Sequence, residues 1–190
     1  MEILKIGEEN YFEVIMRAVA ALREGKVVAV PTDTVYGFAV DATSDEAVKR
    51  LFQIKKREEG KPMPVLVDSM ERAKQIAFIE EKKLEGELSE QWPGAFTAIL
   101  YARELISLLV RGRGGLTVGV RIPDLRFLRD LIRAFGKPIT GTSANRSGEK
   151  PATRAEEIMN ADIVIDGGIC DGTPSTVVDF TVTPSKVLRE

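Results

Sequence analysis

The chain has 190 residues, enough for one ordinary domain with a two-layer core. Its 27 Lys and Arg residues against 29 Asp and Glu residues give a net charge of -2, which excludes a protein whose whole surface binds nucleic acid, so any such contact must be local. The sequence has no histidine and one cysteine, Cys170, which excludes histidine-dependent nucleophilic sites, zinc sites built from histidine or thiolate clusters, and an internal disulfide.

The sequence indicates no targeting or membrane segment. The amino terminus lacks the apolar run of a signal peptide, and no apolar stretch approaches the roughly 20 residues that cross a bilayer. We therefore expect a cytoplasmic protein that makes no membrane contact. Since no repeat, low-complexity tract or linker divides the sequence, we also expect a single domain over residues 1–190.

The first half of the sequence predicts short strands interleaved with amphipathic helices. In chain order we expect a strand at 3–6, a helix between the cap residue Asn10 and Gly25, a strand at 27–30, a helix that starts at Ser44 and ends in a basic loop at 55–61, a strand at 65–67, and charged helices at 71–77 and 80–90. Asn10 and Ser44 are favoured N-cap residues, and Gly25 is a favoured residue after a helix C-terminus.

The second half of the sequence is richer in strands. We expect strands at 96–101, 117–122, 138–140, 163–165, 176–180 and 186–188, a turn of helix between the first two, a helix capped by Asp124 that runs through Ala134, and a short helix with a capping box of Thr153 and Glu156. Strands outnumber helices and do not alternate with them strictly. The predicted fold class is therefore mixed α/β (α+β), a twisted mixed sheet with helices packed around it.

Neither of the two common phosphate-binding motifs is present, because no Gly-Lys pair precedes Ser or Thr and no strand leads into Gly-x-Gly-x-x-Gly. A nucleotide site would need cationic side chains instead. Lys55, Arg57 and Lys61 offer them in a loop flanked by Gly60 and Pro62, where cations can converge on phosphate. Taken alone, this segment is better explained as a solvated run of cations at a helix C-terminus.

A run of small polar residues at 142–145 follows a predicted strand. Its Ser143 and Asn145 side chains could meet phosphate or a purine edge, since ligands commonly bind at loops that follow strands. Alternatively, both side chains could satisfy the backbone of their own turn.

A third segment, Pro31 to Gly37, places Thr32 and Thr34 directly after a buried strand, with Tyr36 as an apolar wall. Hydroxyls and backbone amides at this position could hold an amino acid.

Six short motifs occur in the same order as in a known family. They are Pro-Thr-Asp-Thr-Val-Tyr-Gly from Pro31, Lys-x-Arg from Lys55, Trp-Pro-Gly from Trp92, Thr-Val-Gly-Val-Arg-Ile-Pro from Thr117, Ser-Ala-Asn-x-Ser-Gly from Ser143 and Ser-Thr-Val-Val-Asp from Ser175. The ordered set spans most of the chain and resembles the YrdC-like family of threonylcarbamoyl-adenylate synthases. The resemblance implies a concave twisted sheet, a positively charged cavity, and the use of L-threonine, bicarbonate or CO2, and ATP.

The resemblance also implies roles for individual residues. The expected ATP contacts are Lys55, Arg57, Lys61, Thr117, Ser143, Asn145 and Arg189, of which Lys55 and Arg57 form the expected catalytic pair. The expected L-threonine contacts are Thr32, Thr34, Arg121 and Thr176. Arg121 would bind the carboxylate in bidentate fashion. No residue is assigned to a metal, since Mg²⁺ is expected to be held mainly by the phosphates of ATP.

In the implied reaction, the threonine amine takes up CO2, and the carbamate oxygen attacks the α-phosphorus of ATP and releases pyrophosphate. This chemistry needs no protein nucleophile, so the lack of histidine agrees with it. The product would pass to a separate transferase that modifies the adenosine next to the anticodon of ANN-decoding tRNAs. Two positions depart from the family pattern: Glu58, where many relatives have proline, and Leu66, near which some have histidine.

Two other functions stay open on sequence alone. The first is an RNA-binding or ribosome-associated module without adenylation activity, in which Arg-Gly-Arg-Gly-Gly from Arg111 would track a backbone or form a plain glycine turn. The second is carbamoyl-phosphate-dependent adenylation, which related domains perform within much longer hydrogenase-maturation chains.

Overall fold

The computed structural model describes residues 1–58, 61–146 and 148–190, so that Gly60 and Ser147 of the motifs above lie outside the described residues. Its α-helices are α1 (Tyr11–Arg23), α2 (Asp45–Lys55), α3 (Met70–Ile76), α4 (Lys82–Gln91) and α5 (Arg126–Phe135). Short 3-10 turns lie at Leu108–Val110, Arg113–Gly115 and Ala155–Glu157. The turn of helix expected between residues 101 and 117 is thus present.

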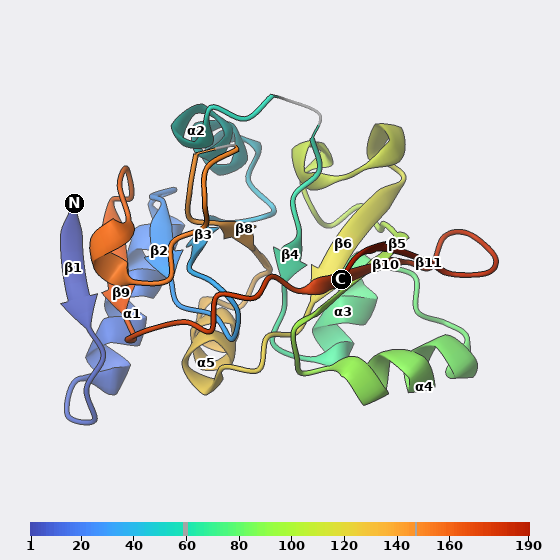
Figure 1. The fold of residues 1–190 in the computed structure, drawn as a ribbon, viewed down its shortest axis with the longest axis horizontal. Coiled ribbons are helices and arrows are strands. Elements are labelled where there is room, and N and C mark those ends of the chain that lie inside the picture. Colours follow the sequence, from blue (N-terminus) through green and yellow to red (C-terminus); the bar gives the residue numbers. More distant parts are fainter. Residues whose placement is uncertain (59–60, 147) are drawn as a thin grey trace.

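The strands form two mixed sheets that lie side by side (Figure 1). The first has the order β1 (Glu2–Lys5), β9 (Ile163–Asp166), β2 (Val28–Val30), β3 (Gly37–Ala39) and β8 (Thr142–Ser143). The second has the order β11 (Lys186–Arg189), β10 (Thr176–Asp179), β5 (Phe96–Tyr101), β6 (Thr117–Arg121), β4 (Val65–Leu66) and β7 (Ile139–Thr140). The predicted mixed α/β class is confirmed, although the strands divide into two sheets instead of one.

Two apolar clusters hold the helices on the sheets. One cluster joins α1 and α5 to the first sheet, and the other surrounds α2, α3 and α4 together with β5 and β6. The buried face of α1 consists of Val14, Ile15, Ala18, Val19, Ala21 and Leu22. This face confirms the helical spacing of apolar residues in the sequence.

The helix ends agree only partly with the predicted caps. Ser44 accepts a hydrogen bond from the Ala47 amide (3.2 Å), and Gly25 follows α1 with a φ of 70°, as expected. Asn10 occupies the cap position of α1, but its Oδ1 accepts from the Gly7 amide (2.7 Å) and not from the helix. The prediction of a side-chain cap at Asn10 was wrong because the preceding turn uses that oxygen.

Two further cap predictions were wrong. Leu125 is the cap residue of α5, and the Asp124 carboxylate instead pairs with Arg129 (3.0 Å). The capping box is formed by Arg154 and Glu157 and not by Thr153 and Glu156, because the 3-10 turn starts one residue later; the Glu157 carboxylate accepts from the Arg154 amide (3.2 Å) and the Thr153 amide (2.7 Å).

Residues 139–143 connect the two sheets. Ile139 and Thr140 pair with β4 in the second sheet, and Thr142 and Ser143 pair with β3 in the first. Gly141 lies between the pairs and donates its amide to Pro64 O (2.8 Å). A Cβ at position 141 would lie 2.5 Å from Leu66 Cγ, so the close approach at this junction requires glycine.

Candidate functional site

A cavity of about 200 Å³ lies between the two sheets. Of the site residues predicted from the sequence, those that line it are Thr32, Thr34, Arg57, Arg121, Ser143 and Arg189. Arg189 is the last residue of β11, an edge strand of the second sheet (Figure 1), and its side chain lines the cavity. The remaining predicted residues, which are not among its described lining, are Lys55, Lys61, Thr117, Asn145 and Thr176.

Arg121, the last residue of β6, links the two sheets at one end of the cavity. Its side chain is 8% exposed and forms an ion pair with Asp33 (2.6 Å) in the loop after β2. It also donates to Thr34 Oγ1 (3.0 Å) and to Gly94 O (3.0 Å). A guanidinium has five N–H groups, so these three bonds within the described residues leave one on each terminal nitrogen.

The hydroxyls of Thr32 and Thr34 lie next to this ion pair. Thr32 donates to Val35 O (2.7 Å), so in the 2.8 Å contact between the two hydroxyls Thr34 must be the donor. Thr34 Oγ1 then donates to Thr32 and accepts from Arg121, so the described residues leave it one lone pair. This oxygen can accept one further hydrogen bond from a ligand in the cavity.

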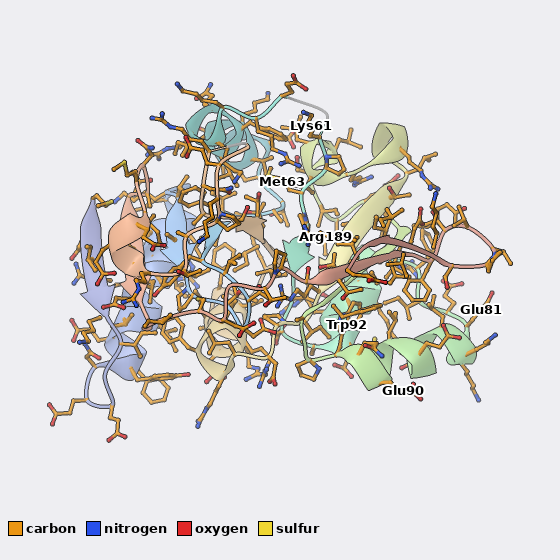
Figure 2. The ribbon with its side chains drawn as sticks, in the orientation of Figure 1. Lys61, Met63, Glu81, Glu90, Trp92 and Arg189 are labelled. Atoms are coloured by element: carbon orange, nitrogen blue, oxygen red, sulfur yellow. The ribbon has the colours of Figure 1, made fainter. Side chains whose placement is uncertain are left out.

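Arg57 reaches the cavity because α2 ends just before it. Lys56 has a left-handed backbone (φ 49°) that terminates the helix, and Arg57 then donates to Pro62 O (2.9 Å). Burial lowers the pKa of Arg57. Lys61 lies farther out, apart from Arg189 (Figure 2), and pairs with Glu58 (2.9 Å).

Arg189 contacts two groups that the sequence did not indicate. Its guanidinium donates to the backbone oxygen (2.9 Å) and to Oγ (3.1 Å) of Ser175, and Ser175 Oγ lies 2.9 Å from Thr97 Oγ1. Ser175 and Thr97 both line the cavity, whereas the predicted Thr176 does not. Alternation along an extended chain explains the difference, because neighbouring side chains point to opposite faces. Ser175 is the first residue of the Ser-Thr-Val-Val-Asp motif, which was the available signal.

Lys55 lies under the loop at 143–145 and is 2% exposed. Its ammonium donates to Ser143 O, to Asn145 O (2.8 Å) and to Asn145 Oδ1 (3.1 Å). Burial and, second, the charge of Arg57 lower the pKa of Lys55 to about 8. Asn145 lines a second hollow of about 200 Å³, which shares Pro151 with the main cavity.

Thr117 begins β6 and Arg121 ends it, so three residues of extended strand lie between them and their Cα atoms are roughly 13 Å apart. Its backbone pairs with Gly112 in the Arg-Gly-Arg-Gly-Gly segment. Arg111 donates to Ile106 O (2.6 Å), and Arg113 pairs with Asp179 (2.6 Å). This segment is therefore a folded turn whose arginines bind within the protein.

Leu66 forms an apolar part of the cavity wall. Within residues 1–58, 61–146 and 148–190, no three His, Cys, Asp or Glu side chains gather as a metal site. No helix in the same ranges has the length and apolar character to cross a bilayer.

Known proteins are similar to this chain in sequence and in fold. A sequence profile of the family Sua5_yciO_yrdC, described as "Telomere recombination", matches residues 20–190. The threonylcarbamoyl-AMP synthase of Bos taurus is 38% identical over 184 residues, which cover 91% of this chain and 66% of that protein. The protein of the same name from Bacillus subtilis (strain 168) is 37% identical over 173 residues, which cover 88% of this chain and 49% of that protein.

A solved structure of Pyrococcus abyssi Sua5 complexed with L-threonine matches with a TM-score of 0.89 and 33% identity, over 99% of this chain and 56% of that chain. The present chain thus spans about half to two thirds of the length of these relatives.

Proposed function

Because the chain belongs to the Sua5_yciO_yrdC family, we propose that it makes threonylcarbamoyl-AMP and pyrophosphate from L-threonine, bicarbonate or CO2, and ATP. The observation that carries the proposal is the buried Arg121, which faces a cavity with two terminal N–H groups unused by the described residues. Two such groups match the two oxygens of a carboxylate.

The amino-acid end of the cavity would be formed by Thr32, Thr34 and Arg121. Arg121 would bind the threonine carboxylate, and the remaining lone pair of Thr34 would accept a hydrogen bond from the amino group or the hydroxyl. Thr176, which the sequence assigned to threonine, would act through its neighbour Ser175 at the cavity wall. The P. abyssi complex with L-threonine supports a threonine site in this fold.

The nucleotide end would be formed by Arg57, Arg189 and Ser143. The described lining of the cavity includes the guanidiniums of Arg57, Arg121 and Arg189 and no carboxylate, which favours a triphosphate over a cation. Drug-sized ligands occupy pockets of roughly 300–1,000 Å³, so the cavity would hold threonine and phosphates but not the whole nucleotide. The adjacent hollow beside Asn145 would take the rest of ATP. Lys61 and Thr117 would contribute only from the periphery.

In this proposal the chemistry belongs to the substrates. The threonine amine takes up CO2 and loses a proton to give a carbamate, whose oxygen bonds to the α-phosphorus as the bond to the pyrophosphate oxygen breaks. The protein aligns the two substrates and offsets the developing charge, chiefly through Arg57. Mg²⁺ would enter with the phosphates of ATP as part of the substrate.

The product would be used by a separate transferase that modifies tRNA. Because ATP, threonine and tRNA are all present in the cytoplasm, the activity would be located there. An RNA-binding module without adenylation activity has less support, because Arg111 and Arg113 are bound within their own domain.

Pyrophosphate release tests the proposal. The protein is incubated with ATP and bicarbonate together with threonine, serine or valine, one at a time. Release should require threonine and should be lost in Arg121→Met, while Arg126→Met, an exposed arginine on α5, serves as the matched control. No release with any amino acid, alongside tight and salt-sensitive binding of RNA, would overturn the proposal.

A further inference from the structure

The ammonium of Lys55 is fully occupied by one loop. It donates to the backbone oxygens of Ser143 and Asn145 and to the side-chain oxygen of Asn145. An ammonium group carries three N–H bonds and has no acceptor. These three acceptors therefore use its whole donor capacity, and in this arrangement no N–H of Lys55 is left for a phosphate oxygen.

The same loop presents side chains to two adjacent hollows. Ser143 lines the main cavity, and Asn145 lines the second hollow. The Ser143 hydroxyl donates to Asn145 Oδ1 (2.6 Å), and this oxygen also accepts from Lys55. One ammonium group thus contacts both residues, alongside the pairing of Ser143 with β3 and the hydrogen bond from Asn145 Nδ2 to Glu149 O (2.5 Å).

The position of Lys55 also explains why the buried charge is tolerated. Lys55 is the last residue of α2, where the helix dipole favours a cation, and its Nζ lies 5.6 Å from the centre of the Phe38 ring. The oxygens of the loop replace the water that burial removes. The contact therefore ties the end of α2 to the end of β8.

We propose that Lys55 is a positioning residue, which holds Ser143 and Asn145 in place and acts on the nucleotide through them without touching phosphate. This inference rests on the proposed function, because it takes the loop at 143–145 as part of the ATP site. Direct contact with phosphate then falls to Arg57, which lines the cavity.

The first experiment needs no ligand. The Ala144 amide donates to Tyr36 O (2.7 Å), so its hydrogen exchange reports opening of the loop. Exchange should be at least about tenfold faster in Lys55→Met than in the wild type. Lys56→Met, which changes the exposed neighbouring lysine, should exchange like the wild type. Equal exchange in Lys55→Met and the wild type would overturn the proposal.

The wild-type protein provides a second measurement should Lys55→Met not fold. In a crystal structure with α,β-methylene-ATP, the Lys55 ammonium should keep its contacts with Ser143 and Asn145. An ammonium within hydrogen-bonding distance of a phosphate oxygen would contradict the proposal. If the analogue fails to bind at all, the proposed function fails, while hydrogen exchange still decides the role of Lys55.

Steady-state kinetics separate positioning from general loss of structure. Lys55→Met and Asn145→Ala should each raise KM for ATP by about tenfold, leave KM for threonine unchanged, and together raise KM for ATP no further than either alone. The effects of Lys55→Met and Arg57→Ala on KM for ATP should instead multiply, because the two residues act on different groups. The proposal would be contradicted if the effects of Lys55→Met and Asn145→Ala on KM for ATP multiplied while those of Lys55→Met and Arg57→Ala did not.

Discussion

The two ends of the cavity are built in different ways. At the Arg121 end, an ion pair between the buried Arg121 and the partly buried Asp33 joins the last residue of β6 to the loop after β2, so that strands of both sheets determine the geometry. At the Ser143 end, Ser143 ends β8 and pairs with β3, Arg57 lies in the loop after α2, and the buried Lys55 ammonium joins the end of α2 to residues 143–145. The comparison indicates that both sheets hold the amino-acid end, whereas the nucleotide end is held by one sheet together with the contacts of one buried cation.

Removal of Arg121 should have the largest effect. Arg121→Met leaves the partly buried Asp33 carboxylate with the Asp124 amide (3.0 Å) but without its cation, so the free energy of unfolding should fall by about 1–3 kcal/mol and threonine-dependent pyrophosphate release should be lost. Chemical denaturation and the pyrophosphate assay measure the two effects. Restored stability in Arg121→Met with Asp33→Asn, without restored activity, would show that binding and structural roles are separate. Wild-type activity in Arg121→Met would contradict the proposed role.

The pKa of Lys55 gives the second prediction. Burial lowers this pKa from 10.5 to about 8, so between these pH values the unfolded chain holds a proton that the folded chain has lost. The free energy of unfolding should therefore rise with pH across this window, by up to about 3 kcal/mol relative to Lys55→Met. Parallel curves for the two proteins between pH 8 and 10.5 would exclude the lowered pKa.

Arg57→Ala should weaken ATP binding by about 10-fold to 100-fold, the usual range for one charge-assisted hydrogen bond. Threonine binding and the free energy of unfolding should change little, because Arg57 lies in a loop outside both apolar clusters. Isothermal titration with each substrate measures these affinities. An unfolded Arg57→Ala would instead support the structural interpretation of the cationic loop.

The smallest expected effect distinguishes Ser175 from Thr176. Ser175→Ala removes a hydroxyl that lines the cavity and meets Arg189 and Thr97, so KM for threonine should rise by roughly tenfold. Thr176 is not among the described lining residues, and valine has nearly the same shape as threonine. Thr176→Val should therefore change KM for threonine less than twofold. Equal effects of the two substitutions would show that Thr176 reaches the substrate itself.

The helices and most strands could be predicted because their signals are local. The apolar spacing in α1 and the Ser44 cap of α2 depend on residues a few positions apart. The division into two sheets depends on pairing between distant segments, such as β3 with β8, and the short strand β8 carries too few residues to show a pattern.

The sequence predicted which segments form the candidate site better than it predicted which side chains line it. The motifs identified the loops that meet at the cavity, including those of Thr34, Arg57 and Ser143. The sequence could not show that Lys55 is buried under another loop or that Thr97 meets Ser175, since both contacts join residues more than 70 positions apart.

Gly141 affects the distance between the two substrates that are proposed to bind between the sheets. The chain crosses from one sheet to the other at this residue, and a side chain there would displace Leu66, which forms part of the cavity wall. Because position 141 is a glycine, the two sheets can approach each other closely at this point. In the proposed reaction, a wider gap would move the carbamate oxygen, formed from the amino group near Arg121, away from the α-phosphorus that it attacks. A position that carries no functional group would thus control the alignment of the two substrates.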